Sequence, residues 1–514
     1  MAATTEKETN YYTQAMPPVR DTRLQIADTF HGCACEMADC SKSGCLLKKN
    51  RTFWQTNACQ MSLTLMMCST VQNSVVIMHG PIGCGTQLHG LSANAAKGKA
   101  KRGLPDQKAP VWLSSNLGET DVINGGEKKL QETIEYADRT YRPEIIFVVA
   151  TCAPNIIGDD VEKIVNITNE TCAAQVTALH CPGFRSRVVS SAYDSFYHSL
   201  IRHINFKPIP YKDYVPDNPA DPAAQMGEAV WKYKISRTVN LFNATSIGDQ
   251  DEAEMTRLLQ ALGLNVRIYA EYSSADDFRL LPFAALNVSL CNMHDDYMLK
   301  FLEQEYNIPY IIEGMPIGPE QTRKWLVAIG KFFGLEKEAN LLCDYEEKKL
   351  LEAIDPLKPG FKDKKVFLGG GSVRVAAEAM ALKKIGIDVI GIRGYNFDSN
   401  ADPVFEELGE ELPEVTLTVS NQAYEFANQL LKYDPDLVIT HNGSHAIPAR
   451  LGYPSIQLFD ANGTYFGYGG FYALAKKIIF ALENNNLAKN IVGHAKLPYR
   501  KEWYEQDPFT YQKD

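Results

Sequence analysis

The 514-residue sequence lacks several features that would mark large functional classes. No uninterrupted apolar stretch reaches the roughly 18 to 20 residues that span a bilayer, and the polar start MAATTEKETNYY contains no secretory core. The formal net charge is −10 with both signs interspersed, so the concentrated basic face that nucleic-acid binding requires is missing. We therefore expect a cytoplasmic protein that binds neither membrane nor nucleic acid.

Motifs for nucleotides, flavin or haem are missing as well. The sequence has no G-x-x-x-x-G-K-S/T loop, and Gly248 stands alone where a dinucleotide fold would have a fuller glycine fingerprint. What the sequence does contain is twelve cysteines. In a chain expected to be cytoplasmic, this number favours metal binding over disulfides.

Three of these cysteines stand at the boundaries of apolar segments. Cys59 opens the helical run CQMSLTLMM, Cys84 follows SVVIMH within HGPIGCG, and Cys152 follows EIIFVVAT. Their spacing is too wide for a zinc ribbon but suits an iron–sulfur cluster held between folded elements. Because three thiolates are one short of the four that a common cluster takes, we expect a second polypeptide to supply the remaining ligands. The alternative is that each cysteine is a small buried apolar residue.

Apolar strands alternate with helices along most of the chain, which predicts an α/β fold with parallel sheets. The clearest expected elements are strands over 74–79, 144–151 and 175–180 and a helix over 127–141. Proline-rich residues 208–222 and residues 355–365 are expected to be linkers. The predicted units are an N-terminal cysteine-containing arm (1–49), an interface-cluster domain (50–230), a second Rossmann-like domain (231–355), a third (361–493) and a C-terminal tail (494–514).

Cys291 repeats the strand-end position of the other cysteines within the second expected domain, in LNVSLCNMHDD. The third expected domain offers four further strand-end loops, most of which contain glycine. Ligands of open α/β sheets bind outside the carboxyl ends of the strands, so these loops and Cys291 are expected to enclose one cavity between domains.

The order CQMSLTLM, HGPIGCG, SSNLGETDVINGGEKKL and ATCAPNIIGDDVE resembles the α-subunit side of the nitrogenase family, and weaker similarity continues to about residue 490. The resemblance implies three doubly wound Rossmann-like domains with parallel sheets around a central metal-cofactor cleft. It also implies that Cys59, Cys84 and Cys152 hold half of a P-cluster-type (8Fe-7S) cluster. The other half would come from a β-type subunit in an α2β2 assembly, with an ATP-dependent iron protein as electron donor.

The same resemblance implies a second metal centre. The position matching Cys291 ligates one end of a large iron–sulfur cofactor in that family, and a histidine in the final strand-end loop ligates the other end. The matching loop here, QLFDANGTYFGYGGF, contains no histidine, and Phe459, Asp460 or Ala461 takes its place. The candidates for a second ligand are His441, His445 and Asp460; a histidine that follows a strand can equally be a hydrogen-bonded structural residue.

Two further positions bear on the chemistry. In HCPGFRSRVVSSAYDSF, which resembles a cofactor-flanking segment of the family, Val189 and Tyr193 stand where a glutamine and a proton-donating histidine are expected. Neither replaces an imidazole that titrates near neutrality, which argues against dinitrogen reduction. Arg374, in GGGSVR, either stabilises an anionic cluster or substrate or is an ordinary helix-start arginine.

Among families of this type, the sequence is most similar to methylthio-alkane reductase, which cleaves carbon–sulfur bonds of small methylated thioethers. This implies ATP-dependent, low-potential reduction of a small molecule. The alternatives are a scaffold for cofactor assembly and, less favoured, a dinitrogen-reducing α-subunit.

Four more cysteines, Cys33, Cys35, Cys40 and Cys45, crowd into thirteen residues of the arm. They predict either a separate metal site or a cysteine-rich arm that packs near the first cluster.

Overall fold

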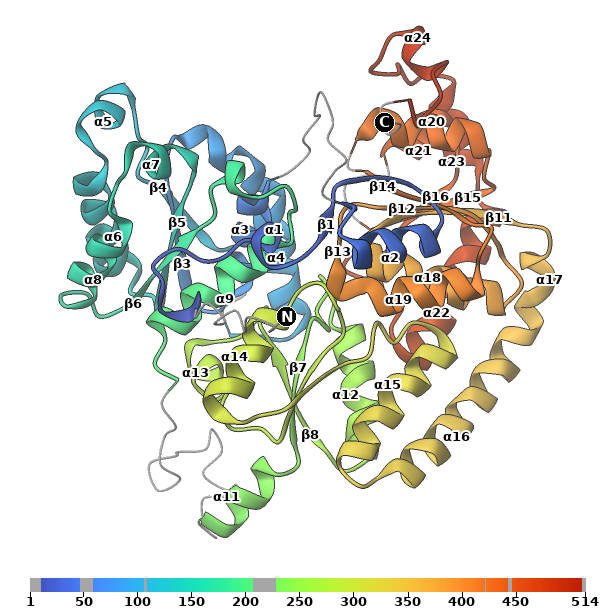
Figure 1. The fold of residues 1–514 in the computed structure, drawn as a ribbon, viewed down its shortest axis with the longest axis horizontal. Helices are drawn as coiled ribbons and strands as arrows, with labels where there is room; N and C mark the ends of the chain where they lie inside the picture. Colours follow the sequence, from blue (N-terminus) through green and yellow to red (C-terminus); the bar gives the residue numbers. More distant parts are fainter. Residues whose placement is uncertain are drawn as a thin grey trace, which may run out of the picture.

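The protein is built on three sheets arranged around a common centre (Figure 1). The computed structural model describes residues 11–46, 59–105, 109–206, 228–420, 422–441 and 446–510, and within these ranges it describes the backbone alone for 86–91 and 228–229. The expected linker over 208–222 lies outside the described residues. Residues 355–365, the other expected linker, are not irregular throughout, because they contain a 3-10 turn (Asp355–Leu357) and the short helix α17 (Lys358–Phe361).

The first sheet has four parallel strands in the order β4-β3-β5-β6. The strands are β3 (Ser74–His79), β4 (Val111–Ser114), β5 (Ile145–Ala150) and β6 (Gln175–His180). Every residue of β3 and β5 is buried, as expected for parallel strands covered on both faces by helices. The expected strands over 74–79 and 175–180 are confirmed, and the one expected over 144–151 is shorter by one residue at each end.

Helices cover both faces of this sheet, on the left in Figure 1. The expected helix over 127–141 is confirmed as α6, whose buried residues Leu130, Ile134 and Ala137 recur at helical spacing and form its inner stripe. The helices of this unit are α3 (Gln60–Thr70), α4 (Leu88–Lys101), α5 (Glu119–Asn124), α6 (Glu127–Tyr141), α7 (Cys152–Ile157), α8 (Val161–Asn169) and α9 (Ser191–His203).

The second sheet is again parallel throughout, in the order β10-β9-β7-β8. Its strands are β7 (Thr238–Phe242), β8 (Asn265–Tyr269), β9 (Leu286–Ser289) and β10 (Tyr310–Ile312). The helices that follow along the chain are α11 (Glu228–Ile235), α12 (Gln250–Ala261), α13 (Ala275–Arg279), α14 (Asp296–Tyr306), α15 (Gly318–Phe332) and α16 (Glu336–Ile354).

The third sheet has six strands in the order β16-β15-β11-β12-β14-β2. The five parallel strands are β11 (Lys365–Gly370), β12 (Asp388–Gly394), β14 (Thr416–Ser420), β15 (Leu437–Thr440) and β16 (Ser455–Gln457). The helices of this unit are α18 (Ser372–Lys384), α19 (Asp402–Glu411), α20 (Ala423–Tyr433), α21 (Ala446–Leu451), α22 (Gly467–Glu483), α23 (Asn486–Val492) and α24 (Lys501–Tyr504).

The sixth strand of the third sheet comes from the N-terminal arm. Strand β2 (Thr29–Gly32) pairs antiparallel with β14, and β1 (Ile26–Ala27) pairs with β13 (Phe397–Asp398). Other parts of the arm contact the first and second units. The ring of Tyr12 packs on Tyr297 of α14, with ring centroids 5.0 Å apart, and the Gln14 carbonyl accepts a hydrogen bond from His198 of α9. Further along the arm, Asp28 forms an ion pair of 2.7 Å with Arg187, which precedes α9.

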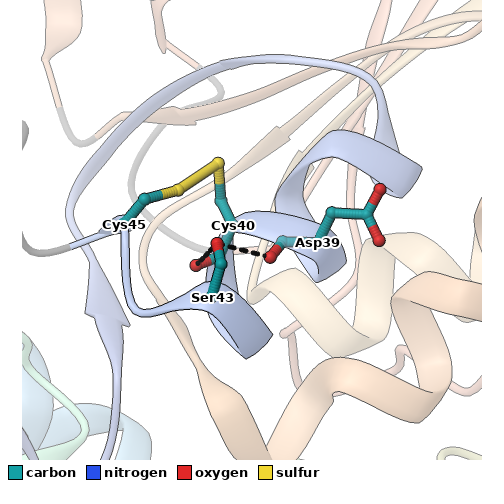
Figure 2. Close-up of a disulfide and its surroundings, with 4 residues drawn as sticks. All are labelled: Asp39, Cys40, Ser43 and Cys45. Atoms are coloured by element: carbon teal, nitrogen blue, oxygen red, sulfur yellow. Dashed lines mark hydrogen bonds between the residues drawn. A yellow bond between two sulfur atoms is a disulfide. The ribbon is translucent and has the colours of Figure 1, made fainter.

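The cysteine-rich part of the arm forms helix α2 (Ala34–Ser43), which packs against α19 of the third unit (Figure 1). The expectation that it packs near the first cluster is therefore wrong. A disulfide joins Cys40 to Cys45 (Figure 2), so for these two cysteines the prediction of metal binding over disulfides is wrong, whereas the other ten cysteines are free. The reason is local: Gly44 ends α2 in the left-handed conformation and turns Cys45 back beside Cys40, so that their Cα atoms are 4.9 Å apart.

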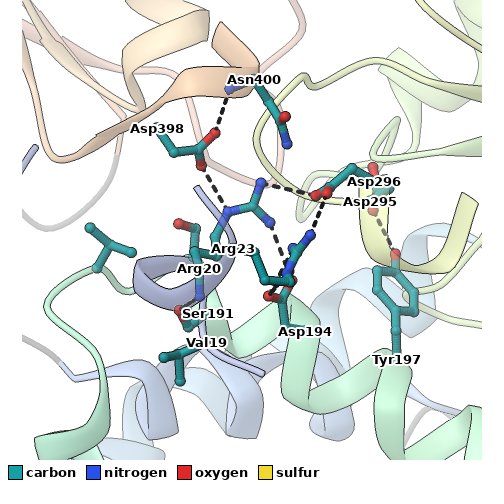
Figure 3. A network of polar contacts seen from close by, with 12 residues as sticks. Val19, Arg20, Arg23, Ser191, Asp194, Tyr197, Asp295, Asp296, Asp398 and Asn400 are labelled. Atoms are coloured by element: carbon teal, nitrogen blue, oxygen red, sulfur yellow. Dashed lines mark hydrogen bonds and ion pairs between the residues drawn. The ribbon is translucent and has the colours of Figure 1, made fainter. Parts of the chain in front are cut away.

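Arg20, in the short helix α1 (Arg20–Arg23), ties all three units together. Its fully buried guanidinium contacts Asp194 of α9, Asp296 of α14 and Asp398 of β13 at 3.3, 2.9 and 2.8 Å (Figure 3). Arg23 adds ion pairs of 2.9 Å to both Asp194 and Asp296. Because an unpaired buried charge is costly, this network fixes the arm and the three units in one arrangement.

The buried side chains also cross unit boundaries. One continuous cluster joins the cores of the second and third sheets, and another joins α3, the first sheet and α9 to α14 and Phe242 of β7. Among the described residues, no helix is both long and apolar enough to cross a membrane.

Candidate active site

Cys59, Cys84 and Cys152 are brought together at the carboxyl edge of the first sheet. Cys59 is the residue before α3, Cys84 lies in the 3-10 turn Ile82–Gln87 after β3, and Cys152 begins α7 directly after β5. Strands β3 and β5 are neighbours in parallel register, so the loops that follow them leave the sheet side by side. All three cysteines are free and partly exposed.

The backbone of Gly183, in the turn that follows β6, lies against two of these cysteines, Cys59 and Cys152. A Cβ atom at Gly183 would lie 3.1 Å from the Cys59 Cβ and 3.4 Å from its Sγ, and 3.7 Å from the Cys152 Sγ. The Gly183 N–H donates to the Cys152 sulfur at 3.2 Å, and the Gln60 side chain donates to the Pro182 carbonyl at 2.6 Å. A larger residue here would crowd the Cys59 side chain, so glycine favours this close approach of backbone to sulfur.

The third thiol, that of Cys84, lies close enough to Cys59 and Cys152 to feel their charges. Burial raises the pKa of the Cys84 thiol, and the negative charges of Cys152 and Cys59 in their thiolate forms raise it further. Within the described ranges, no three histidine, cysteine or acidic side chains lie close enough to hold a single metal ion. The three thiols are nevertheless close enough to influence one another electrostatically.

Two other cysteines near this space have a different character. Cys68 and Cys181 are fully buried in the hydrophobic core below it, and burial is the main cause that raises the pKa of both thiols. They behave as small apolar core residues. The contrast with the partly exposed Cys59, Cys84 and Cys152 separates candidate ligands from packing residues.

Large apolar side chains stand exposed on the elements that carry the three thiols. They are Ile82, beside Cys84, at 65% exposure; Ile156 of α7, at 72%; and Phe184, beside Gly183, at 60%. Ile123, on α5 next to α7, reaches 81%. An exposed apolar patch of this kind marks an interaction surface. The Arg185 Nη1 nearby is buried without a hydrogen-bond partner in the described structure.

Cys291 lies in a buried loop between β9 and α14. The Ser289 side chain orders this loop, because its hydroxyl accepts from the Cys291 N–H at 3.1 Å and donates to Asp295 at 2.5 Å. Burial raises the pKa of the Cys291 thiol to about 12, Asp295 adds to the rise, and Arg374 opposes it. The thiol would thus stay protonated until a metal displaces the proton.

A cavity opens where all three units meet. Cys291 is not among its lining residues, but it interacts electrostatically with two of them, Tyr193 and Arg374. The space between its lining atoms amounts to about 590 Å³, solvent at its mouth included. The lining residues are Met66, Ser69, Thr70, Asn94, Ala95 and Tyr193 of the first unit, Asn243, Thr245, Ser246, Ile247, Glu271 and Tyr272 of the second, and Arg374 and Phe459 of the third.

Tyr193 and Phe459, two of the positions singled out in the sequence, both line this cavity. The Tyr193 ring stacks on His294 with 4.1 Å between ring centroids, and the His294 Nδ1 lies 2.9 Å from the Asn243 side-chain nitrogen. Burial raises the pKa of Tyr193 and lowers that of His294, so both rings are neutral at pH 7. Val189 is not among the residues that line the cavity.

Arg374 reaches the cavity from the start of α18. Its guanidinium donates to the Tyr465 hydroxyl and lies over the Tyr465 and Phe466 rings, 5.3 and 5.7 Å from their centroids. The side chain is 9% exposed, which excludes an ordinary surface arginine. The positive charge of Arg374 favours the thiolate form of Cys291.

The candidates for a second ligand have other partners. The Nε2 of His441 lies 3.0 Å from Glu378, which leaves Nδ1 as the ring nitrogen available for a metal. Asp460 pairs with Lys477 at 2.9 Å and is itself partly exposed. His445 lies outside the described residues.

Sequence reasoning missed two side chains of this region, Glu271 and His294. Glu271 follows β8 by two residues, and His294 lies three residues after Cys291. Their strand-end positions are the only signal that could have identified them, because an isolated glutamate or histidine at such a position is common.

The chain is similar to proteins of one known family. A family model described as nitrogenase component 1 type oxidoreductase matches residues 59–483. The nitrogenase molybdenum-iron protein alpha chain of Methanothermobacter marburgensis is 25% identical over 432 residues, which cover 82% of this chain and 86% of that protein. The nitrogenase iron-molybdenum cofactor biosynthesis protein NifE of Methanococcus maripaludis is 24% identical over 415 residues, 79% of each.

A solved structure of nitrogenase Cp1 at pH 6.5 matches with a TM-score of 0.65 and 20% sequence identity, and the match covers 88% of this chain and 93% of that one. The predicted α/β fold with parallel sheets is thereby confirmed. Because the family model spans most of the chain, this protein is a member of the nitrogenase component 1 type oxidoreductase family.

Proposed function

We propose that this chain is the α-type subunit of a nitrogenase-like reductase that cleaves carbon–sulfur bonds of small methylated thioethers. It would act with a β-type subunit, in an α2β2 assembly, and with an ATP-dependent iron protein. The observation that carries the proposal is the convergence of Cys59, Cys84 and Cys152 at a partly exposed, apolar-rimmed edge of the first sheet.

The three thiols fit half of a P-cluster-type (8Fe-7S) cluster. They come from three elements that meet at one edge of the sheet, and thiolates are the usual ligands of iron–sulfur clusters. The Gly183 N–H already points at the Cys152 sulfur, as it would in a cluster whose sulfurs accept backbone hydrogen bonds. Arg185, with its orphaned Nη1, offers a positive charge to an anionic group.

The exposed isoleucines and Phe184 support a partner on the same face. Ile82, Ile156 and Phe184 each lie within four residues of a thiol or of Gly183, so a chain that covered them would also approach the open side of the thiols. Side chains this exposed are costly unless a partner covers them. A β-type subunit that supplies the remaining ligands would cover these apolar side chains and reach the open side of the thiols.

Cys291 and Arg374 fit the anchoring of a large iron–sulfur cofactor in the central cavity. Cys291, behind the lining residues Tyr193 and Arg374, would give one thiolate, and Arg374 would compensate the negative charge of the bound group. When bound, that cofactor would supply low-potential electrons. The protein's own side chains exclude water, orient the substrate and hold protons.

The lining of the cavity favours an apolar substrate. Tyr193, Phe459 and Met66 contribute aromatic and thioether surface, and Tyr193 is fixed by its stacking on His294. A small methylated thioether would bury its methyl groups against these side chains. Neither Tyr193 nor His294 titrates near neutrality, so neither ring replaces the proton-donating imidazole expected of a dinitrogen-reducing subunit.

The similarity to NifE supports a second candidate, a cofactor-assembly scaffold. A scaffold would hold the same clusters but pass its cofactor on, so it would show no sustained turnover. Methane release from dimethyl sulfide over many turnovers, with the iron protein and ATP present, would exclude a scaffold role.

Cys84→Ala tests the central observation. We expect the anaerobically purified variant to lose iron and to associate less with its β-type partner, whereas Cys172→Ala, a change at a partly buried cysteine far from the three thiols, should keep both. Unchanged iron content and an intact heteromer in Cys84→Ala would overturn the cluster assignment.

A further inference from the structure

The central cavity contains a carboxylic acid that the proposed function has not used. Among the described residues that line it, Glu271 is the one acidic side chain, and Arg374 is the one basic side chain. The remaining lining groups are apolar, amides, hydroxyls and phenols. A lone carboxyl group in such a pocket is a candidate for proton transfer.

The backbone around Glu271 is held firmly. The next residue, Tyr272, has a φ of 60°, a left-handed conformation that costs energy in a residue other than glycine. Its ring lies 3.7 Å from the Arg102 guanidinium carbon, and Arg102 is in turn fixed by Glu252 and by three carbonyl groups of residues 246–248. Glu271 is thus positioned by contacts that do not involve its own carboxyl group.

The surroundings keep the carboxyl group protonated at higher pH than usual. Burial raises the pKa of Glu271 to about 7. The negative charges of Asp295, which directly precedes α14, and of Glu252 on α12 add to the rise, and the backbone N–H groups of Glu271 and Ala270 oppose it. The phenols that face it, Tyr193 and Tyr197 on α9 and the neighbouring Tyr272, carry no charge at this pH. The two nearby arginines have other partners: Arg102 forms an ion pair with Glu252, and Arg374 donates a hydrogen bond to the Tyr465 hydroxyl.

We infer that Glu271 is the proton donor of the central cavity, the group that protonates a substrate as it is reduced there. This inference rests on the proposed function for its reaction. It does not depend on which metal the cofactor contains. The tyrosines and the histidine around the cavity do not exchange protons near pH 7, so Glu271 is the side chain there that can supply one.

The step balances as follows for a methyl thioether. Two electrons from the iron protein and two protons convert CH3–S–R to CH4 and HS–R, so the carbon–sulfur bond breaks and one C–H and one S–H bond form. The Glu271 O–H bond breaks to give one of these protons. Water at the cavity mouth then returns a proton to the carboxylate, and a second cycle of donation supplies the other.

Infrared spectroscopy of the anaerobically purified holoenzyme tests the acid directly. We expect a protonated-carboxyl band that disappears as the pH rises through about 7 and that is missing in Glu271→Gln. Burial raises the pKa of Asp295 to about 6, against its hydrogen bonds from Ser289 and Tyr197, so Asp295→Asn is needed to assign a second band at lower pH. Absence of a Glu271-dependent band would overturn the inference whatever the activity.

Turnover provides the second test. Glu271→Gln should lower kcat by roughly 10²- to 10⁴-fold with little change in KM or iron content, and Glu271→Asp should recover part of the rate. The wild-type rate should fall above about pH 7, where the acid loses its proton, and the residual rate of Glu271→Gln should not show this fall. Glu352→Gln, at an exposed position on α16, serves as the matched control.

The two possible failures are distinguishable. If the wild type reduces thioethers and Glu271→Gln does so equally well, the inference is wrong and the proposed function stands. If the wild type reduces no thioether, the proposed function is wrong. The infrared titration then decides by itself whether Glu271 is an acid of this cavity.

Discussion

The Nε–H of Arg20 donates to the Asp398 carboxylate across 2.8 Å, and neither side chain is exposed to solvent. Among the described residues, Arg20 precedes every sheet strand, whereas Asp398 belongs to the third unit. Together with Asp194 and Asp296, this contact makes one arginine the common ion-pair partner of all three units.

Arg20→Met should strongly destabilise the protein, because it leaves buried carboxylates without their compensating charge. We expect a loss of roughly 3 to 5 kcal/mol, measured as a lower midpoint in anaerobic urea unfolding. Arg139→Met, at an exposed position on α6, provides the control and should leave the midpoint where it is. An unchanged midpoint in Arg20→Met would mean that the aspartates are protonated or hydrated in the native state.

Acid should release the start of the arm through His198. Its Nε2–H donates to the Gln14 carbonyl and its Nδ1 accepts from the Tyr297 hydroxyl, both at 2.9 Å, which requires a neutral ring. Burial lowers the pKa of His198 to about 4. The unfolded chain therefore binds the proton first, and the stability contributed by the neutral ring falls as the pH drops from about 6.5 towards 4, by roughly 3 kcal/mol in total.

Hydrogen exchange of residues 11–24 checks this prediction. Exchange in this segment, corrected for the intrinsic pH effect, should become faster below about pH 6 in the wild type. In His198→Gln, whose amide does not titrate, the corrected rate should be independent of pH. A wild-type segment that stays equally protected at pH 4 would contradict the assignment of the neutral ring.

A charge placed on the apolar rim should separate the subunits without unfolding the chain. Ile156→Asp puts a carboxylate at a position that is already 72% exposed, so the isolated chain should keep its stability. We expect weaker association with the β-type partner after anaerobic co-expression, measured by light scattering on a sizing column. Phe480→Asp, at a 67% exposed position on α22, should leave association unchanged; equal effects of both changes would remove the basis for the interface.

Cys291→Ala should separate the two proposed metal centres. The variant keeps Cys59, Cys84 and Cys152, so it should retain the iron and the spectroscopic signal of the interface cluster. It should lose the iron and signal of the cofactor and the reduction of dimethyl sulfide to methane. Full iron content with full activity would show that Cys291 is only a buried small residue.

The sequence allowed the regular elements and the cysteine positions to be predicted because both have local signatures. A buried parallel strand is a short apolar run, and β3 and β6 begin and end where that run does. Cys84 and Cys152 could be located because each follows such a run. The parallel order of β3 and β5 brings Cys84 and Cys152 together, whereas Cys59 is placed beside them by the packing of the start of α3 on residues 182–183.

The contacts of Arg20 could not be predicted in the same way. Its three partners lie between 174 and 378 positions further along the chain, and no local pattern marks an arginine that will be buried. Strand β2 was missed for a related reason, since its four residues, Thr29–Gly32, acquire their conformation from pairing with β14. The role of Glu271 depends on burial and on Asp295 and Glu252, which only the folded structure brings near it.

The pairing of β2 with β14 also sets an order of events during synthesis. Gly32 leaves the ribosome long before its partner Leu417, because most of the chain lies between them. At a translation rate of about 5 to 20 residues per second, roughly 20 to 80 seconds pass between the synthesis of β2 and that of its partner strand β14. During that time the apolar residues of the arm, Phe30 among them, have no sheet to join, so the nascent chain is open to mispairing and to chaperones until the third unit is made.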